Sequence, residues 1–187
     1  MEGKPQKETS KLKVPYTVFK GFPMHTEVLE ELTEEIADLQ KPVVINEGPT
    51  YSSFFMNPLE RPEKILNKFY AERTSEIMKA YGLYHISRYN YVYWMQTYDK
   101  DSTGHPQHHH YEQNRDVILS WVHFLKTPPG IHCFRFTNGL GIVNYPKEQL
   151  EGNIIVFPSW ALHEVVPHNQ NFEGIIIAGN IQLDEIS

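Results

Sequence analysis

The sequence predicts a mainly β fold with helices at its N-terminal end. Many short antiparallel strands are expected to form a jelly-roll, or double-stranded β-helix, around one cavity. Apolar residues recur at helical spacing up to Gly82 and alternate with a period of two from Tyr84 onward. Turn signals such as Thr127-Pro-Pro-Gly130 and Asn138-Gly139 separate the alternating segments. A length of 187 residues favours one buried core rather than two.

Residues 14–83 are expected to form an N-terminal layer behind a polar, frayed tail of residues 1–13. Thr26 is suited to cap the first helix, and Gly82 to end the second. In chain order, we expect a strand, a helix, a strand and a helix over residues 15–19, 26–40, 41–46 and 62–81.

Residues 84–183 are expected to form the β-rich core, with both helices packed on its outside. No internal repeat or linker interrupts the chain, so residues 1–187 are treated as a single domain. The expected strands cover residues 84–98, 117–125, 131–136, 153–157, 163–166 and 174–183.

Composition narrows the class of protein. The net charge of -6 and the pI of about 5.9 provide no basic surface for nucleic acid. No apolar run is long enough to span a membrane, and the Lys-rich N-terminus lacks the apolar stretch of a signal peptide. The single Cys133 excludes an intramolecular disulfide. We therefore expect a cytoplasmic protein.

A candidate metal motif lies in two halves about fifty residues apart. Gly104 leads into His110-Tyr-Glu112, and Gly152 leads at the same spacing into Pro158 and then His163. Residues two apart on a strand point to the same side, so His110 and Glu112 can chelate one ion. Two histidines and one carboxylate are the ligands that hold non-haem Fe(II) and leave positions open for a co-substrate and O2.

The His-rich stretch also allows a second set of ligands. His108, His110 and Glu112 would share one face of an extended strand, so His108 is the alternative ligand. We favour His110, Glu112 and His163 because they keep the glycine spacing and supply a negative charge. The alternative is that the His-rich stretch consists of surface histidines that bind metal ions weakly and form no functional site.

The two-part glycine, histidine and proline spacing is similar to that of cupins, and the likeness extends further. The chain resembles 2-oxoglutarate- and Fe(II)-dependent oxygenases, above all the prolyl-hydroxylase-like oxygenases of bacteria and tailed phages. The resemblance covers about residues 84–183. It rests on the segments 94–98, 104–112, 120–125, 157–160, 163–167 and 178–180.

The resemblance implies an enzyme that uses Fe(II), 2-oxoglutarate and O2. Such an enzyme would hydroxylate a substrate, for example a prolyl or another amino-acid residue, while 2-oxoglutarate is decarboxylated to succinate. The substrate, a small molecule or a peptide, is not identified by the sequence. A phage-encoded chain would work in the host cytoplasm.

The sequence departs from these relatives at the co-substrate anchor. They usually hold the distal carboxylate of 2-oxoglutarate with an Arg on the strand after the distal His, but residues 172–174 here contain no base. Arg135, between two phenylalanines, is the favoured substitute, and Arg115 and Lys126 are the others. Tyr98 could add a hydroxyl. Asn180 either faces the pocket near the co-substrate, as the resemblance implies, or caps the end of a strand.

The missing Arg keeps two other functions open. One is a cupin-type metalloprotein that does not use 2-oxoglutarate, and the other is a non-catalytic barrel. Two further histidines have structural interpretations: we expect His123 to be hydrogen-bonded in the core, and His168 to be solvated in a loop after Pro167.

Overall fold

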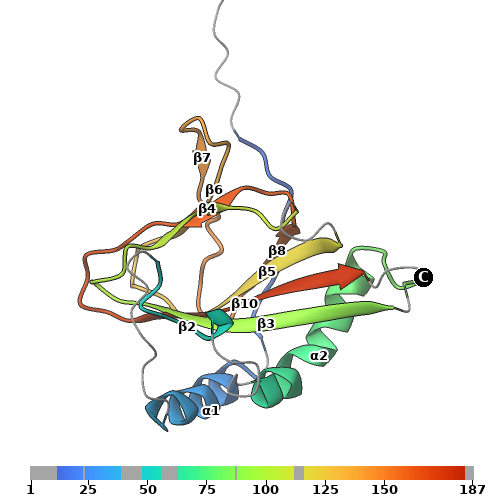
Figure 1. Ribbon diagram of the computed structural model, residues 1–187, viewed down its shortest axis with the longest axis horizontal. Helices are drawn as coiled ribbons and strands as arrows, with labels where there is room; N and C mark the ends of the chain where they lie inside the picture. Colours follow the sequence, from blue (N-terminus) through green and yellow to red (C-terminus); the bar gives the residue numbers. More distant parts are fainter. Residues whose placement is uncertain are drawn as a thin grey trace, which may run out of the picture.

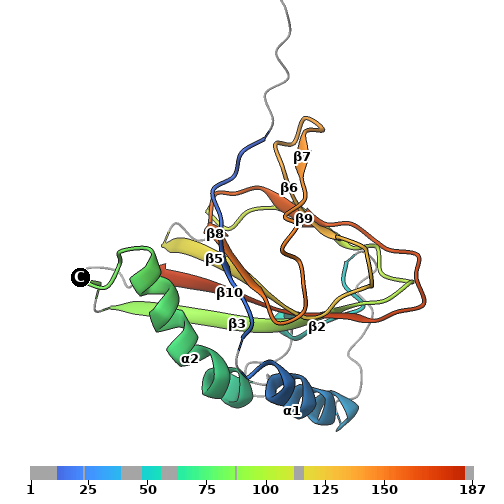
Figure 2. The same cartoon turned by 180° about the vertical axis from the view of Figure 1, so that it is seen from behind.

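The computed structural model describes residues 12–22, 24–38, 48–55, 63–86, 88–111 and 116–183. Two helices lie against one face of a six-stranded sheet, and a four-stranded sheet lies over the other face (Figures 1 and 2). The elements are β1 Thr17–Phe19, α1 His25–Asp38, β2 Tyr51–Ser52, η1 Ser53–Phe55, α2 Glu63–Ala80, β3 Tyr89–Tyr98, β4 His105–His108, β5 Val117–Lys126, β6 Phe134–Thr137, β7 Val143–Asn144, β8 Ile154–Pro158, β9 His163–Val165 and β10 Gly174–Leu183.

Every strand pairing is antiparallel. The six-stranded sheet has the order β1-β8-β5-β10-β3-β2, and the four-stranded sheet has the order β4-β9-β6-β7. The longest strands, β3, β5 and β10, lie side by side in the larger sheet. The mainly antiparallel β architecture with two helices is therefore confirmed. Among the described helices, none combines the length and apolar composition needed to cross a membrane.

The helices cover the larger sheet with apolar side chains at helical spacing. Val28 and Leu32 of α1 are fully buried four residues apart, and Tyr70 and Ile77 of α2 are buried seven apart. These side chains pack with Met95, Trp121 and Ile177 of the sheet. Gly82 has a φ of +70°, the left-handed conformation that commonly ends a helix.

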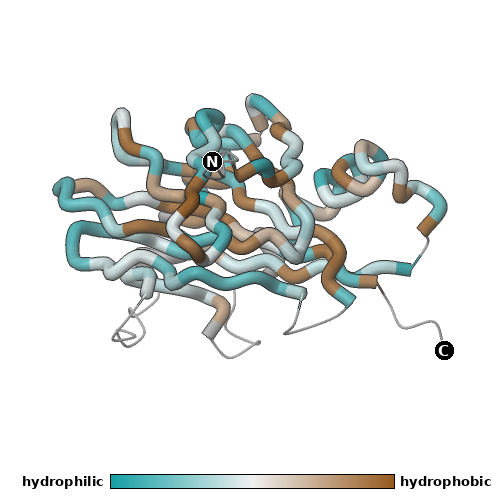
Figure 3. The backbone as a smooth tube through the Cα atoms, turned by 90° about the horizontal axis from the view of Figure 1, so that it is seen from above, coloured by the Kyte–Doolittle hydropathy of each residue, from teal (hydrophilic) through white to brown (hydrophobic). Residues whose placement is uncertain are grey.

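Alternation along the strands separates two cores. On β5, Trp121 and Leu125 face the helices, whereas Val122 and Phe124 face the four-stranded sheet. The core between the sheets is rich in phenylalanine. Segments of hydrophobic residues run through the middle of the molecule (Figure 3). Side chains between the sheets are thus separated from the helices by a full sheet.

The observed elements differ from the expected ones mainly at their ends. Strand β3 begins at Tyr89 rather than Tyr84, because Tyr84 and His85 lie in an exposed turn. Thr26 lies inside α1, which begins one residue earlier. Strands β2, β4 and β7 were not predicted as such, and residues 1–11 and the strand expected over 41–46 lie outside the described residues.

Gly179 on β10 provides the space for the largest fully buried side chain. It pairs with Tyr93 on one side and Trp121 on the other, and the Trp121 ring lies over it. A Cβ at residue 179 would lie 2.4 Å from an indole carbon, far inside van der Waals contact. Indole and strand could not both keep their positions with a larger residue there.

We therefore predict that Gly179→Ala lowers the free energy of unfolding by about 1–3 kcal/mol, the usual cost of overpacking a core. Denaturant unfolding measures the change. Gly174→Ala in the same strand is the control, because the added Cβ would meet nothing closer than 3.6 Å. Equal stability of the two variants would contradict the packing described for Trp121.

Candidate metal centre

The pairing of β4 with β9 brings the two halves of the metal motif together. His108 lies opposite His163, and His105 lies opposite Val165. β4 carries one extra residue between these pairs, so both of its histidines turn to the same side and their rings stack at 4.1 Å. Gly104, at the start of β4, has a φ of +82°, and a Cβ there would lie 2.1 Å from the carbonyl oxygen of Val165. Only glycine allows this approach.

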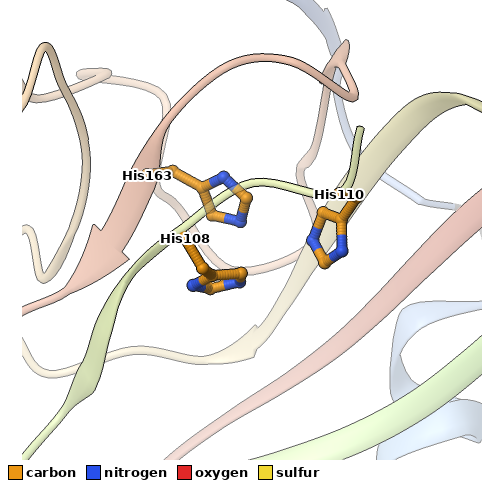
Figure 4. Close-up of side chains that lie close together, drawn as sticks. All are labelled: His108, His110 and His163. Carbon is orange, nitrogen blue, oxygen red and sulfur yellow. The ribbon is translucent and has the colours of Figure 1, made fainter. Parts of the chain in front are cut away.

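His110 joins the cluster from a bend. The extended strand ends at His108, and the backbone N–H of His110 donates to the carbonyl of Ser159 at 2.9 Å. The expected extended strand through residues 110 and 112 is therefore wrong at His110 and Tyr111. Ring nitrogens of His108, His110 and His163 nevertheless lie within 4.8 Å of one another (Figure 4).

The cluster is electrically neutral. Burial, assisted by the neighbouring imidazoles, lowers the pKa of His105 and His110 to about 3 and that of His163 well below its ordinary range. The pKa of His108 is lowered for the same main reason. Phe157 and Phe134 supply part of this environment, with ring centroids 4.8 and 5.6 Å from His163. Neutral imidazole is the form that binds metals.

Hydrogen bonds place the lone pairs of two rings. Nδ1 of His163 donates to the carbonyl of Ala161, and Nδ1 of His108 donates to the carbonyl of Pro106, each at 2.8 Å. A carbonyl oxygen can only accept, so Nε2 of both rings carries a free lone pair. Backbone partners of this kind also orient metal-ligating histidines. The three rings therefore fit a divalent metal ion.

Asn180 and Trp94 flank the cluster on the larger sheet. The Asn180 amide nitrogen lies 3.4 Å from Nδ1 of His110, and its carbonyl oxygen accepts a hydrogen bond from Ser120 at 2.8 Å. The Trp94 ring lies 6.2 Å from the His110 ring. Asn180 thus lines the metal pocket, and its role toward a co-substrate stays a prediction.

Three cavities lie at the cluster or next to it. The metal pocket contains the four histidines together with Asn180. An outer groove of about 430 Å³ is lined by His105, His108 and His110 and extends past Phe54, Trp94 and Gln182. An inner chamber lies deeper between the sheets, and it shares four wall residues with the metal pocket: Val122, Phe134, Val165 and Ile176.

Two of the predicted co-substrate residues line the inner chamber. Tyr98 is buried there, and its hydroxyl donates to Gln96 at 2.9 Å. Lys126 also lines the chamber, with its ammonium 5.1 Å from the centre of the Phe172 ring. Glu112 and Arg115 lie outside the described residues.

Arg135 does not reach any of these cavities. Phe134 and Phe136 point into the core between the sheets, so Arg135 projects from the opposite face of β6. There its Nε donates to Glu164 at 2.8 Å and its Nη1 to the Tyr145 hydroxyl at 2.7 Å. The prediction that Arg135 anchors the co-substrate is therefore wrong. The alternation of side chains along β6 predicted that Arg135 points away from its two phenylalanine neighbours. It did not predict which face of the strand is interior.

Of the two histidines given structural interpretations from the sequence, His123 matches its interpretation and His168 does not. His123 is fully buried on the helix side, 2.6 Å from the Tyr70 hydroxyl and 3.3 Å from His25, as a hydrogen-bonded core residue should be. His168 is buried rather than solvated, because the loop after β9 folds over Tyr98 and places it in the inner chamber. No local sequence signal indicates this.

Solved structures share this fold, although no protein-family model and no curated protein matches the sequence. A prolyl-4-hydroxylase of Pseudomonas putida superposes with a TM-score of 0.64 at 14% identity, covering 92% of this chain and 94% of that one. A viral collagen prolyl hydroxylase of Paramecium Bursaria Chlorella virus-1, in a 2-oxoglutarate complex, gives 0.62 at 19% over 91% and 96%. A Trichoplax adhaerens prolyl hydroxylase, in complex with a peptide fragment of hypoxia inducible factor, gives 0.61 at 17% over 89% and 83%. The expected structural likeness to prolyl-hydroxylase-like oxygenases is confirmed.

The neutral cluster predicts a pH dependence of folding in the metal-free protein. The histidines of the cluster bind fewer protons in the folded protein than in the unfolded protein. Folding lowers their pKa from the ordinary value of 6.5, and the pKa of His110 falls to about 3. The free energy of unfolding should therefore be highest above about pH 6.5 and fall as the pH drops, by about 1.4 kcal/mol per pH unit for each proton involved.

Denaturant unfolding between about pH 5 and 6.5, where carboxylates titrate little, isolates this contribution. His163→Asn should make the slope shallower, whatever it does to the overall stability. His85→Asn, in the exposed turn before β3, should leave the slope unchanged. A slope identical in wild type and His163→Asn would show that the cluster does not resist protonation.

Proposed function

We propose that this protein is an Fe(II)- and 2-oxoglutarate-dependent dioxygenase that hydroxylates a peptide substrate. The observation that carries the proposal is the neutral histidine cluster at the junction of an outer groove and an inner chamber. We further propose that the two sheets correspond to the double-stranded β-helix of such enzymes.

His110 and His163 are the metal ligands common to both sets considered from the sequence. The third is His108, whose nitrogen belongs to the cluster of described residues, or Glu112. His108 completes a set of three neutral ligands, whereas Glu112 would supply the carboxylate of the facial triad. Asn180 would help to orient His110 through the contact between their side chains.

The inner chamber is suited to the co-substrate. A ligand bound at the histidine cluster can extend between Val122 and Ile176 of one sheet and Phe134 and Val165 of the other, toward Lys126. Bound Fe(II) would hold 2-oxoglutarate and O2 and supply the oxidation of a substrate C–H bond coupled to decarboxylation. The chain's own contribution is to bind the co-substrate at both ends and exclude water along an apolar wall.

The outer groove is suited to a neutral substrate group. Its described lining is aromatic at Phe54 and Trp94, aliphatic at Val92 and Val117, and otherwise carries only amide and imidazole side chains. A free amino acid would bring two charges that need partners, and the described lining contains no Asp, Glu, Lys or Arg. Peptide groups on either side of a prolyl or other neutral residue could instead bond to the amides of Gln96 and Gln182.

A cupin-type metalloprotein that does not use 2-oxoglutarate is the second candidate. Three neutral histidines can hold a metal ion by themselves. The absence of a base after the distal histidine, where Glu173 and Gly174 stand, favours this function. A metal-free, non-catalytic protein is the third outcome that the experiments below can reach.

We predict that His110→Ala and His163→Ala each weaken Fe(II) binding by more than about 100-fold, because losing a ligand costs more than losing the residue behind it. Anaerobic titration of the metal-free protein with Fe(II) measures this. A comparable loss in only one of His108→Ala and Glu112→Ala identifies the third ligand. His109→Ala, whose ring is not part of the cluster, is the control. Unimpaired binding in His110→Ala would contradict the proposed site.

We predict that the Fe(II)-loaded protein converts 2-oxoglutarate to succinate with O2 and hydroxylates a peptide with an internal proline more readily than free proline. Mass spectrometry and succinate release measure the two products. Arg135→Ala should match the wild type, because its guanidinium is paired with Glu164 outside the cavities. Metal binding without 2-oxoglutarate binding would favour the cupin-type function. A protein that binds neither the metal nor 2-oxoglutarate would be non-catalytic.

A further inference from the structure

The inner chamber has an apolar lining interrupted by a few polar side chains, among them Thr127 and Gln149, whose amide nitrogen is already bonded to backbone carbonyls. Its far end carries Tyr98, Lys126, Cys133 and His168, and four apolar residues lie between this end and the histidine cluster. A carboxylate buried there needs a positively charged partner, because removing a charge from water without pairing it is unfavourable. The chemistry of these side chains therefore decides what the chamber can hold.

His168 contains a buried polar atom that lacks a partner. The side chain is 5% exposed, and its Nε2 donates to the backbone carbonyl of Tyr98 at 3.3 Å. Its Nδ1 is buried and has no hydrogen-bond partner within the described part of the chain. Such atoms are rare in folded proteins because burial removes their hydrogen bonds to water without replacing them. A ligand group in the chamber would supply the missing hydrogen bond.

The hydrogen bond to Tyr98 determines which kind of group can bind. Since the carbonyl can only accept, Nε2 keeps its proton, and Nδ1 of a neutral ring is a lone pair. A carboxylate oxygen is also an acceptor and would be repelled by that lone pair. Protonation of Nδ1 gives an imidazolium that donates from both nitrogens, to Tyr98 and to the carboxylate.

Lys126 supplies the second cation. Its ammonium lies over Phe172 from the loop that also carries His168, and its side chain lines the same chamber. The other titratable groups of the lining are Tyr98 and Cys133. Burial raises the pKa of both, so each keeps its proton near neutral pH. Neither can take up the proton that carboxylate binding requires.

Resting on the function proposed above, we propose that His168 and Lys126 together hold the distal carboxylate of 2-oxoglutarate. We propose also that His168 takes up a proton when the co-substrate binds. Two cations from the β5 end and the loop after β9 thus replace the single Arg that related enzymes carry on the following strand. Co-substrate binding becomes linked to pH through a residue remote from the metal ligands.

Calorimetric titration of 2-oxoglutarate into the anaerobic, Fe(II)-loaded protein tests the proposal without turnover. Measured at about pH 8 in two buffers with different ionisation enthalpies, the wild type should take up close to one proton per ligand bound. His168→Gln is the matched variant: its amide can keep the donor to Tyr98 but has no counterpart of Nδ1. It should lose the proton uptake and bind 2-oxoglutarate roughly 10- to 100-fold more weakly.

Two further variants separate the parts of the proposal. Lys126→Met keeps the apolar contact with Phe172 and should weaken binding to a similar extent while retaining proton uptake. Arg135→Ala should change neither quantity. Fe(II) affinity, measured on each variant, shows that the histidine cluster remains intact. If His168→Gln does not fold, the proton uptake of the wild type and the behaviour of Lys126→Met still decide the question.

The possible failures are distinguishable. Wild-type protein that binds Fe(II) but not 2-oxoglutarate would overturn the proposed function, and this inference with it. Wild-type protein that binds 2-oxoglutarate without proton uptake would overturn the role of His168 alone. Unchanged affinity in Lys126→Met would remove that lysine from the anchor.

Discussion

The antiparallel pairing of β4 with β9 is the constraint on which the rest of the site depends. It places His108 opposite His163 although the two residues are far apart in sequence. The close approach of Gly104 to the Val165 carbonyl excludes any side chain at that position, so the strands have little freedom to shift. Because one strand carries an extra residue, two histidines that would otherwise point to opposite faces share one face. The loops that follow inherit this register: His110 is held by Ser159, and His168 reaches Tyr98.

Periodicity predicted most of the fold because long elements average over many side chains. Both helices and the strands β5, β8, β9 and β10 lie where the pattern placed them, within a few residues. Strands β2, β4 and β7 consist of Tyr51–Ser52, His105–His108 and Val143–Asn144, and none of them contains a run of apolar side chains from which a period could be read. The sequence indicated His108, His110 and His163 as candidate metal ligands, because metal-binding residue types at that spacing are unusual. Arg135 and His168 were misjudged for one shared reason: local sequence does not tell which side of a strand or loop the rest of the chain will cover.

Electrostatic character changes along the cavity between the sheets. At one end, buried imidazoles stay uncharged, so a divalent cation would bind there without first displacing protons. At the other end stands the Lys126 ammonium group, and between the two ends lies an apolar wall of Val122, Phe134, Val165 and Ile176. A doubly negative ligand chelated to a cation at one end would meet complementary charge at both ends. The helices take no part in this arrangement, because the six-stranded sheet lies between them and the cavity.

The wall shared by the metal pocket and the inner chamber would limit the length of a dicarboxylic ligand that can bind at both ends. Val122 and Ile176 project from one sheet and Phe134 and Val165 from the other, so strands of both sheets form the wall between the two polar ends. A dicarboxylic keto acid one methylene shorter than 2-oxoglutarate would leave its far carboxylate among apolar side chains. A keto acid one methylene longer would have to bend against the Phe134 side chain. Selection among metabolic acids would then follow from strand geometry, with no dedicated residue needed to reject the wrong ones.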